Sequence, residues 1–148
     1  MARIRRIVHP TDFSSASGPA FRKALELAKD NNAALPIVHV LPALPIMGDA
    51  YIASTAYDEM LRAQRAQAEK SMQRLLQRAR AAGVRATGTV LDSGAIADQV
   101  VRFAKRARAD VIVMGTHGHG ILARALLGSV AERVISKASI PVMTIKEK

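Results

Sequence analysis

Cysteine is absent from the 148-residue sequence. Its absence excludes disulfide bonds, thiolate nucleophiles and cysteine-ligated zinc or iron–sulfur centres. Long hydrophobic runs are also missing, since no apolar stretch approaches the ~20 residues that a membrane-crossing helix needs. The N-terminal segment MARIRRIVHP has neither the apolar stretch nor the small-residue cleavage site of a secretory signal peptide. Together these absences predict a cytoplasmic protein without a membrane partner.

Aromatic residues make up only 3% of the chain, although hydrophobic residues make up 49%. The core must therefore be built from Val, Ile, Leu, Ala and Met, a composition typical of buried parallel strands covered by helices. The length suits one compact domain, and no repeat, low-complexity tract or linker divides the sequence. We therefore expect a single domain over residues 1–148.

Acidic residues are few beside basic ones, 12 against 22, which gives a formal net charge of +10. Such a charge suggests nucleic acid or an anionic membrane as a partner. However, the basic residues of segments 58–82 and 95–108 interleave with Ala, Gln and acidic residues, without aromatic side chains that could stack on bases. We interpret them as a solubilising surface, and keep a basic nucleic-acid-interacting module as an alternative.

The hydrophobic pattern alternates between strand-like and helix-like segments along the whole chain. We expect five strands and four helices, with the strands near residues 4–8, 33–41, 84–91, 111–114 and 142–145, and the helices near 19–29, 54–82, 95–108 and from 129 onward. This alternation predicts an α/β fold, a doubly wound five-stranded parallel sheet with helices on both faces. With the strand order 3-2-1-4-5, a ligand would bind between the first and fourth strands, where loops 10–15 and 115–120 meet.

Glycine is concentrated in the segment that follows the fourth expected strand. Gly115, Gly118 and Gly128-Ser129 follow the spacing G-x2-G-x9-G-S between a strand and a helix start. Glycines there would allow positive φ angles and a close approach to phosphates, next to a helix N-terminus that favours anions. Ser129 and Glu132 also have the spacing of a capping box. The pattern is neither a Walker A loop nor a dinucleotide fingerprint, so a different phosphate site is predicted; glycines that simply end a strand are the alternative.

Three further polar residues are candidates for the same site. Asp12 follows the first strand and could bind ribose hydroxyls or stand behind a metal ion, or it could be an ordinary loop cap. His117 and His119 lack a third ligand nearby, so we expect no metal site, and we interpret His117 as a packed loop residue and His119 as a residue close to phosphates. No Ser-His-Asp set or carboxylate pair has a catalytic spacing, so the sequence offers no catalytic machinery.

The segment VIVMGTHGHGILARALLGSVAERVISKASIPVMTI, together with IVHPTDFS and IVHVL, resembles the universal stress protein family over essentially the whole chain. The glycine and serine spacing is that of the ATP-binding branch. The resemblance implies that ATP, with or without Mg²⁺ or Mn²⁺, is bound by Pro10, Thr11, Asp12, Val40, Met114, Gly115, His117, Gly118, His119, Gly128, Ser129 and Val130. Within this set the Val40 backbone would read the adenine edge. The resemblance also implies a homodimer through the last strand, Val142 to Ile145.

One residue departs from the family pattern. Many members have Arg where this chain has His119, so a permanent cation is replaced by a mostly neutral group. Our primary hypothesis is an ATP-binding, nucleotide-dependent regulator of the stress response with slow or absent hydrolysis. The alternatives are a metal-dependent nucleotide hydrolase or transferase, with Asp12 holding the metal, and the nucleic-acid-interacting module.

Overall fold

The sheet has the predicted topology. A computed structural model describes residues 3–44, 54–117 and 127–147. Within these ranges five strands pair in parallel in the order β3-β2-β1-β4-β5. The strands are β1 (Ile7–Pro10), β2 (Leu35–Val40), β3 (Ala86–Leu91), β4 (Val111–Gly115) and β5 (Val142–Ile145). The helices are α1 (Gly18–Asn31), α2 (Ser54–Ala81), α3 (Ile96–Arg106) and α4 (Ser129–Lys137), with a 3₁₀ turn at Ser15–Ser17 before α1.

Alternating side chains of the central strands supply two separate cores. Ile7 faces a core shared with α1 and α2, whereas its neighbour Val8 faces a core shared with α3 and α4. The same alternation occurs along β4, where Val113 joins the first core and Met114 the second. Because successive strand residues point to opposite faces, the apolar runs of the sequence cover both sides of the sheet. The prediction of helices on both faces is confirmed.

The two edge strands are less buried than the central ones. In β3, Thr87 and Gly88 are exposed, and in β5 the exposed fraction of Met143 is 38%. The buried parallel strands that the composition indicates are therefore β1, β2 and β4, whereas β3 and β5 are partly open to solvent. An edge strand has a partner on one side, so part of its surface remains open to solvent.

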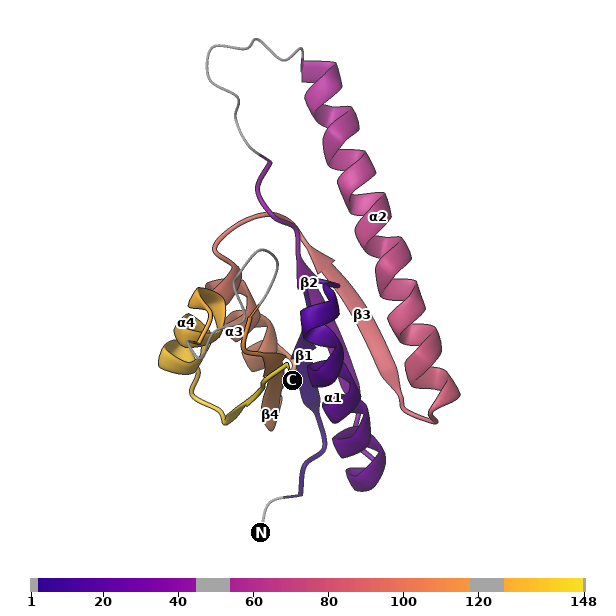
Figure 1. Cartoon of the computed structure of the whole chain (residues 1–148), viewed down its shortest axis with the longest axis vertical. Helices are drawn as coiled ribbons and strands as arrows, with labels where there is room; N and C mark the ends of the chain where they lie inside the picture. Colours follow the sequence, from indigo (N-terminus) through magenta and orange to yellow (C-terminus); the bar gives the residue numbers. More distant parts are fainter. Residues whose placement is uncertain (1–2, 45–53, 118–126, 148) are drawn as a thin grey trace.

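The predicted helix boundaries are close to those observed. Pro19 lies in the first turn of α1, and Asn32 ends that helix with a left-handed φ of 51°. Gly83, with a φ of 77°, follows α2 as the expected stop signal. In Figure 1, α2 runs along β3 and its N-terminal part extends beyond the ends of the strands. Among the described residues, no helix combines the length and apolar character that crossing a bilayer requires.

Candidate functional site

A cavity of about 620 Å³ lies at the carboxyl ends of β1, β2 and β4. Its position is the switch point of the sheet, because the connections after β1 and β4 lead to helices on opposite faces. Ten of the twelve predicted site residues line it: Pro10, Thr11, Asp12, Val40, Met114, Gly115, His117, Gly128, Ser129 and Val130. Gly118 and His119 lie outside the described residues. The structure thus brings the loop after β1 and the described part of the second predicted loop, residues 115–117, together around one space.

The loop after β1 is held by hydrogen bonds among its own polar residues. The Asp12 Oδ1 atom accepts hydrogen bonds from the Ser14 backbone N–H, at 2.9 Å, and from the Ser14 hydroxyl. The Thr11 hydroxyl accepts one from the Phe13 N–H at 3.0 Å and lies 3.2 Å from the Ser17 hydroxyl. Asp12 therefore has the loop-anchoring role that we considered as an alternative, and it also lines the cavity.

Phe13 occupies an unusual backbone conformation inside this loop. Its φ is 62°, in the left-handed region that costs a side-chain-bearing residue roughly 1–3 kcal/mol. The Phe13 ring packs on the His39 ring, with 4.4 Å between centroids. His39 Nδ1 in turn donates to the Thr11 carbonyl at 2.8 Å, because a carbonyl can only accept. Contacts from β2 therefore compensate for the local strain and fix the loop against the cavity.

The second side of the cavity is the connection between β4 and α4. Gly128 N donates to the Thr116 carbonyl at 2.7 Å, and Thr116 N donates to Ile145 O at 3.2 Å. A Cβ atom at Gly128 would lie 2.6 Å from the Thr116 oxygen. Gly128 is thus required for close backbone approach, as predicted. Of the described glycines, only Gly83 has a positive φ, so the predicted positive φ at Gly115 and Gly128 is wrong.

The start of α4 differs from the predicted capping box. Gly128 is the N-cap, without a side-chain cap hydrogen bond, and Ser129 is the first helical residue. The Ser129–Glu132 spacing is therefore one residue out of register, because a capping box needs its serine at the N-cap. The backbone N–H groups of a first helical turn have no intrahelical partner, and Ser129, Val130 and Ala131 all line the cavity. This wall offers donors and the positive end of a helix dipole to an anion.

His9 joins β1 to β4 where the two strands separate. The paired register ends at Val8 and Ile112, and the fully buried His9 side chain then donates from Nδ1 to the Val113 carbonyl at 2.8 Å. Its Nε2 has no partner among the described residues. Burial lowers the pKa of His9 to about 4, although the bond to Val113 and the charge of Asp12 act in the opposite direction. The imidazole is therefore neutral near pH 7, and it holds β1 to β4 one residue before the cavity-lining Pro10 and Met114.

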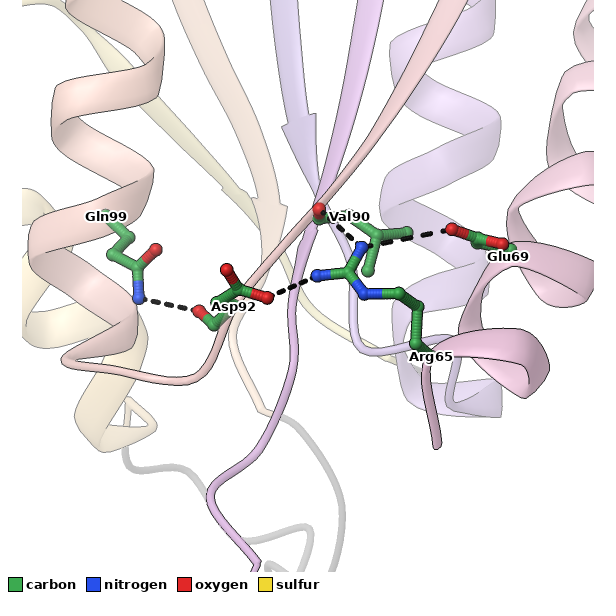
Figure 2. A network of polar contacts seen from close by, with 5 residues as sticks. All are labelled: Arg65, Glu69, Val90, Asp92 and Gln99. Carbon is green, nitrogen blue, oxygen red and sulfur yellow. Dashed lines mark hydrogen bonds and ion pairs between the residues drawn. The ribbon is translucent and has the colours of Figure 1, made fainter. Parts of the chain in front are cut away.

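Two helices from opposite faces of the sheet complete the wall of the cavity. Gln64, Gln67, Ala68 and Ser71 come from α2, and Ile96 and Val100 come from α3. Figure 2 shows how Arg65 of α2 reaches Asp92, whose carbonyl accepts from Gln99 of α3 at 3.0 Å. Arg65 also donates to the Val90 carbonyl at 3.4 Å. These contacts set the separation of α2 and α3 at the end of β3.

Charge is scarce on the described part of the lining. Asp12 is the carboxylate there, and no Lys or Arg belongs to the described lining residues. The described residues also contain no group of three His, Cys, Asp or Glu side chains that could hold a metal ion. Within this part of the chain, an anionic ligand would meet backbone N–H groups, the α4 dipole and neutral side-chain donors such as the Ser129 hydroxyl, and no Lys or Arg side chain. Most other lining side chains are apolar, as is typical of pockets for organic ligands.

Comparison with known proteins gives the chain a family. The model of the universal stress protein family matches residues 3–146. The chain belongs to this family. The universal stress protein MJ0531 of Methanocaldococcus jannaschii is 34% identical over 143 residues, which cover 97% of this chain and 82% of that protein.

Two solved structures extend the comparison of this universal stress protein with its relatives. The structure of MJ0577 matches with a TM-score of 0.85 and 24% identity over 99% of both chains, a likeness that concerns the fold alone. The universal stress protein from Archaeoglobus fulgidus, solved in complex with dAMP, matches with a TM-score of 0.68 and 26% identity. That match covers 98% of this chain and 100% of the other. The predicted family and fold are both confirmed.

The contribution of α2 to the cavity is absent from the sequence-based prediction. Gln64, Gln67, Ala68 and Ser71 follow the spacing i, i+3, i+4, i+7, which places them on one face of a helix. A stripe of short or uncharged polar residues on an otherwise charged helix is the signal that could have identified this wall. Phe13 and His39 were also missed, because their roles depend on a contact between two strands' ends.

Proposed function

We propose that this universal stress protein binds an adenine nucleotide, with ATP as the expected ligand, in the cavity between β1 and β4. The observation that carries the proposal is the convergence of ten predicted site residues on one cavity, with the N-terminus of α4 in its wall. The dAMP complex of the A. fulgidus relative supports an adenine-containing ligand. Because the family match spans residues 3–146, we regard the whole chain as one nucleotide-binding domain.

Each part of the cavity suits one part of a nucleotide. Val38, Val40 and Met114 offer apolar surface to a base, and the Val40 backbone is the proposed reader of the adenine edge. Val40 lies two residues beyond Val38, the residue with which Pro10 is paired, so it reaches past the end of β1. Thr11 and Asp12 would lie beside the ribose, and Gly115, Gly128, Ser129 and Val130 would surround the phosphates. Gly118 and His119 complete the proposed phosphate segment in sequence.

The chemistry of the described lining favours binding over hydrolysis. Asp12 Oδ1 already accepts two hydrogen bonds from Ser14, which engages that oxygen in the loop and lowers its value as a general base. Mg²⁺ or Mn²⁺ would come with ATP through phosphate oxygens, with Asp12 as the carboxylate that the described lining offers. We therefore propose a regulator of the stress response whose nucleotide occupancy alters a protein surface, with slow or absent hydrolysis.

A homodimer through β5 is the second part of the proposal. β5 is an edge strand, so one side of its backbone is open to pairing with another copy. Met143 on β5 and Ile135 on α4 are among the exposed large apolar side chains, at 38% and 44%. A nucleotide held between β1 and β4, with its phosphates at α4, is separated from this edge by β4 alone, which gives occupancy a route to the dimer surface.

Ligand-dependent stability tests nucleotide binding directly. We expect ATP with Mg²⁺ at millimolar concentration to raise the melting temperature, because a ligand at 100 times its Kd stabilises the folded state by about 2.7 kcal/mol. Ser129→Asp should abolish this rise, since the new carboxylate repels phosphates, while the same carboxylate favours the helix N-terminus and preserves the free protein. Ser129→Asn is the matched neutral control and should retain binding.

Three outcomes would contradict the proposal. A wild-type protein without any ATP-dependent rise has no nucleotide site. Ser129→Asp with wild-type ATP affinity moves the phosphates away from α4. Steady-state phosphate release that disappears in Asp12→Asn, at unchanged ATP affinity, would instead identify a metal-dependent nucleotide hydrolase.

A further inference from the structure

Four segments that are distant in sequence lie together at the amino ends of the strands, opposite the cavity. They are residues 3–6 before β1, 29–32 at the end of α1, 80–85 from the last turn of α2 to the start of β3, and 105–110 from the last turn of α3 to the start of β4. Backbone hydrogen bonds join them: Ala34 N donates to Arg5 O, Leu35 N to Arg85 O, and Asp110 N to Arg6 O, each at 2.8 Å. In Figure 1 the N-terminus and the ends of α1 and α2 lie at this same lower end. We name the basic residues of these segments the basic end.

Most of the net charge of the protein lies there. The four segments contain nine basic residues and two acidic ones, a net charge of +7 out of the +10 of the whole chain. All nine basic side chains are exposed: Arg3, Arg5, Arg6, Lys29, Arg80, Arg85, Lys105, Arg106 and Arg108. These residues are spread over more than a hundred positions of the sequence. The parallel sheet brings them to one end of the molecule, because every strand starts at that end.

Acidic side chains do not neutralise the basic end. The ion pairs found among the described residues involve Lys23, Arg65 and Lys137 as cations, and none of these belongs to the basic end. Asp110 directs Oδ2 to the backbone N–H groups of Arg5 and Arg6, at 2.7 and 2.9 Å. These two bonds are the main cause of the lowered pKa of Asp110, and the charges of Arg5 and Arg6 lower it further. Among the described residues, no ion pair joins the Asp110 carboxylate to either guanidinium group.

Helix dipoles account for only part of this arrangement. Cations are commonly placed at helix C-termini, and Arg3 and Arg85 do donate to the carbonyls of Asn31 and Asn32 at the end of α1, at 3.3 and 3.2 Å. Three helices end in this region, and their dipoles together amount to about −1.5 charges. The net charge of +7 exceeds that amount several-fold, so most of it is available to an external anion.

We propose that the basic end binds the phosphate backbone of a nucleic acid. Seven of its nine cations are arginines, whose planar forks suit phosphate oxygens better than a lysine ammonium does. Cations suffice to bind a nucleic-acid backbone, whereas a stable protein interface, or stable anchoring of a basic patch to a membrane, also needs apolar contacts. The exposed large apolar residues, Met60, Ile96, Leu127, Ile135 and Met143, all lie outside these segments.

The sequence-based interpretation as a solubilising surface is revised on this basis. It rested on the dispersal of basic residues along two helices, which describes Arg62, Lys70 and Arg74 of α2. The residues that cluster in space come from the last turns of three helices and from the segments that lead into the strands, so their dispersal in sequence says nothing about their distance in space.

The experiment measures binding of the full-length protein to labelled single-stranded DNA of about 20 nucleotides by fluorescence anisotropy, at about 50 to 200 mM NaCl. The variant Arg5→Gln/Arg6→Gln/Arg106→Gln removes three exposed cations from the basic end. The matched control Arg62→Gln/Lys70→Gln/Arg74→Gln removes three exposed cations from α2, so both variants have the same net charge. The melting temperature of each variant establishes that it is folded. Its ATP affinity gives a second check, because the proposed ATP site lies at the opposite ends of the strands.

We expect the basic-end variant to bind at least about tenfold more weakly than wild type at 100 mM salt, with a salt slope reduced by about 2 because each lost phosphate contact contributes about 0.7. The α2 control should stay within about threefold of wild type. Equal losses in both variants would mean that net charge alone attracts the DNA, and would overturn the assignment. Absence of wild-type binding at 50 mM salt, or equal binding to polyglutamate or to phosphatidylserine vesicles, would overturn it as well.

Discussion

The buried imidazole of His9 makes the stability of the whole protein sensitive to acid. The folded state holds its pKa near 4, against a usual value of 6.5. Above pH 6.5 the imidazole is neutral in both states and has no effect on the free energy of unfolding. As the pH falls from 6.5 to about 4, the unfolded chain takes up a proton that the folded protein excludes. Stability is therefore lost over this window, by up to about 3 kcal/mol.

Replacement of His9 by asparagine tests this assignment. His9→Asn keeps an N–H donor for the Val113 carbonyl and removes the titrating group, so the variant should lose less stability between pH 7 and pH 4.5. Urea unfolding at the two pH values measures the difference. His117→Asn makes the same change at a half-buried position and serves as the control. An unchanged pH dependence in His9→Asn would exclude His9 as the source.

Some residues of the candidate site could be located from their position along the chain. Asp12 follows β1 and Gly115 ends β4, and because the carboxyl ends of parallel strands lie together, the convergence of these two residues could be predicted. The reason given for the glycines was only half right, since space beside Thr116 and not a positive φ requires Gly128. The roles of Phe13 and His39 could not be predicted, because their contact joins residues 26 positions apart in sequence.

At the scale of elements, Gly128 sets how closely α4 approaches β4. Gly128→Ala should push the first turn of α4 away from Thr116, because the new Cβ would meet a backbone oxygen at 2.6 Å that cannot move alone. We expect a loss of about 1–3 kcal/mol in stability and a loss of nucleotide affinity measurable by calorimetry.

Gly115→Ala is the matched control for stability, since its Cβ would make only ordinary contacts of 3.5 Å with Ala16 and His117. Its free energy of unfolding should change by less than about 1 kcal/mol. Equal destabilisation by the two substitutions would mean that the approach of α4 to Thr116 has no special importance.

The order and type of the elements were predictable, and the placement of α2 was not. The hydrophobic pattern identified every strand and helix, because buried strands appear as short apolar runs and helices as apolar residues at helical spacing. The α2 wall of the cavity depends on the packing of that helix against β3, where a Cβ at Gly88 would come within 2.5 Å of Met72 Cγ. Such close packing is a tertiary property that periodicity alone does not contain.

At the scale of the whole molecule, the exposed edge at β5 predicts self-association. Wild-type protein should elute with twice its 15.9 kDa mass in size-exclusion chromatography with light scattering. Met143→Lys should shift it to the monomer, because a charge on an edge strand opposes strand pairing. Met60→Lys changes a similarly exposed methionine on α2 and should leave the dimer intact. A monomeric wild type, or a dimeric Met143→Lys variant, would contradict the β5 interface.

The charge distribution belongs to the same scale and was hidden in the sequence. Counting charged residues along the chain gives the net charge of +10, but it could not reveal that the segments before four different strands lie at the same end of the sheet. Topology supplies that information, because parallel pairing places all strand starts together.

The separation of the cavity from the basic end determines how the two could influence each other. The six residues of β2 span about 20 Å, which is more than twice the Debye length of about 8 Å in physiological salt. Phosphates in the cavity would therefore change the potential at the opposite edge very little, and a ternary complex is sterically allowed. Any measured coupling free energy between the two ligands would then report a shift of the backbone that connects them and not a direct effect of charge.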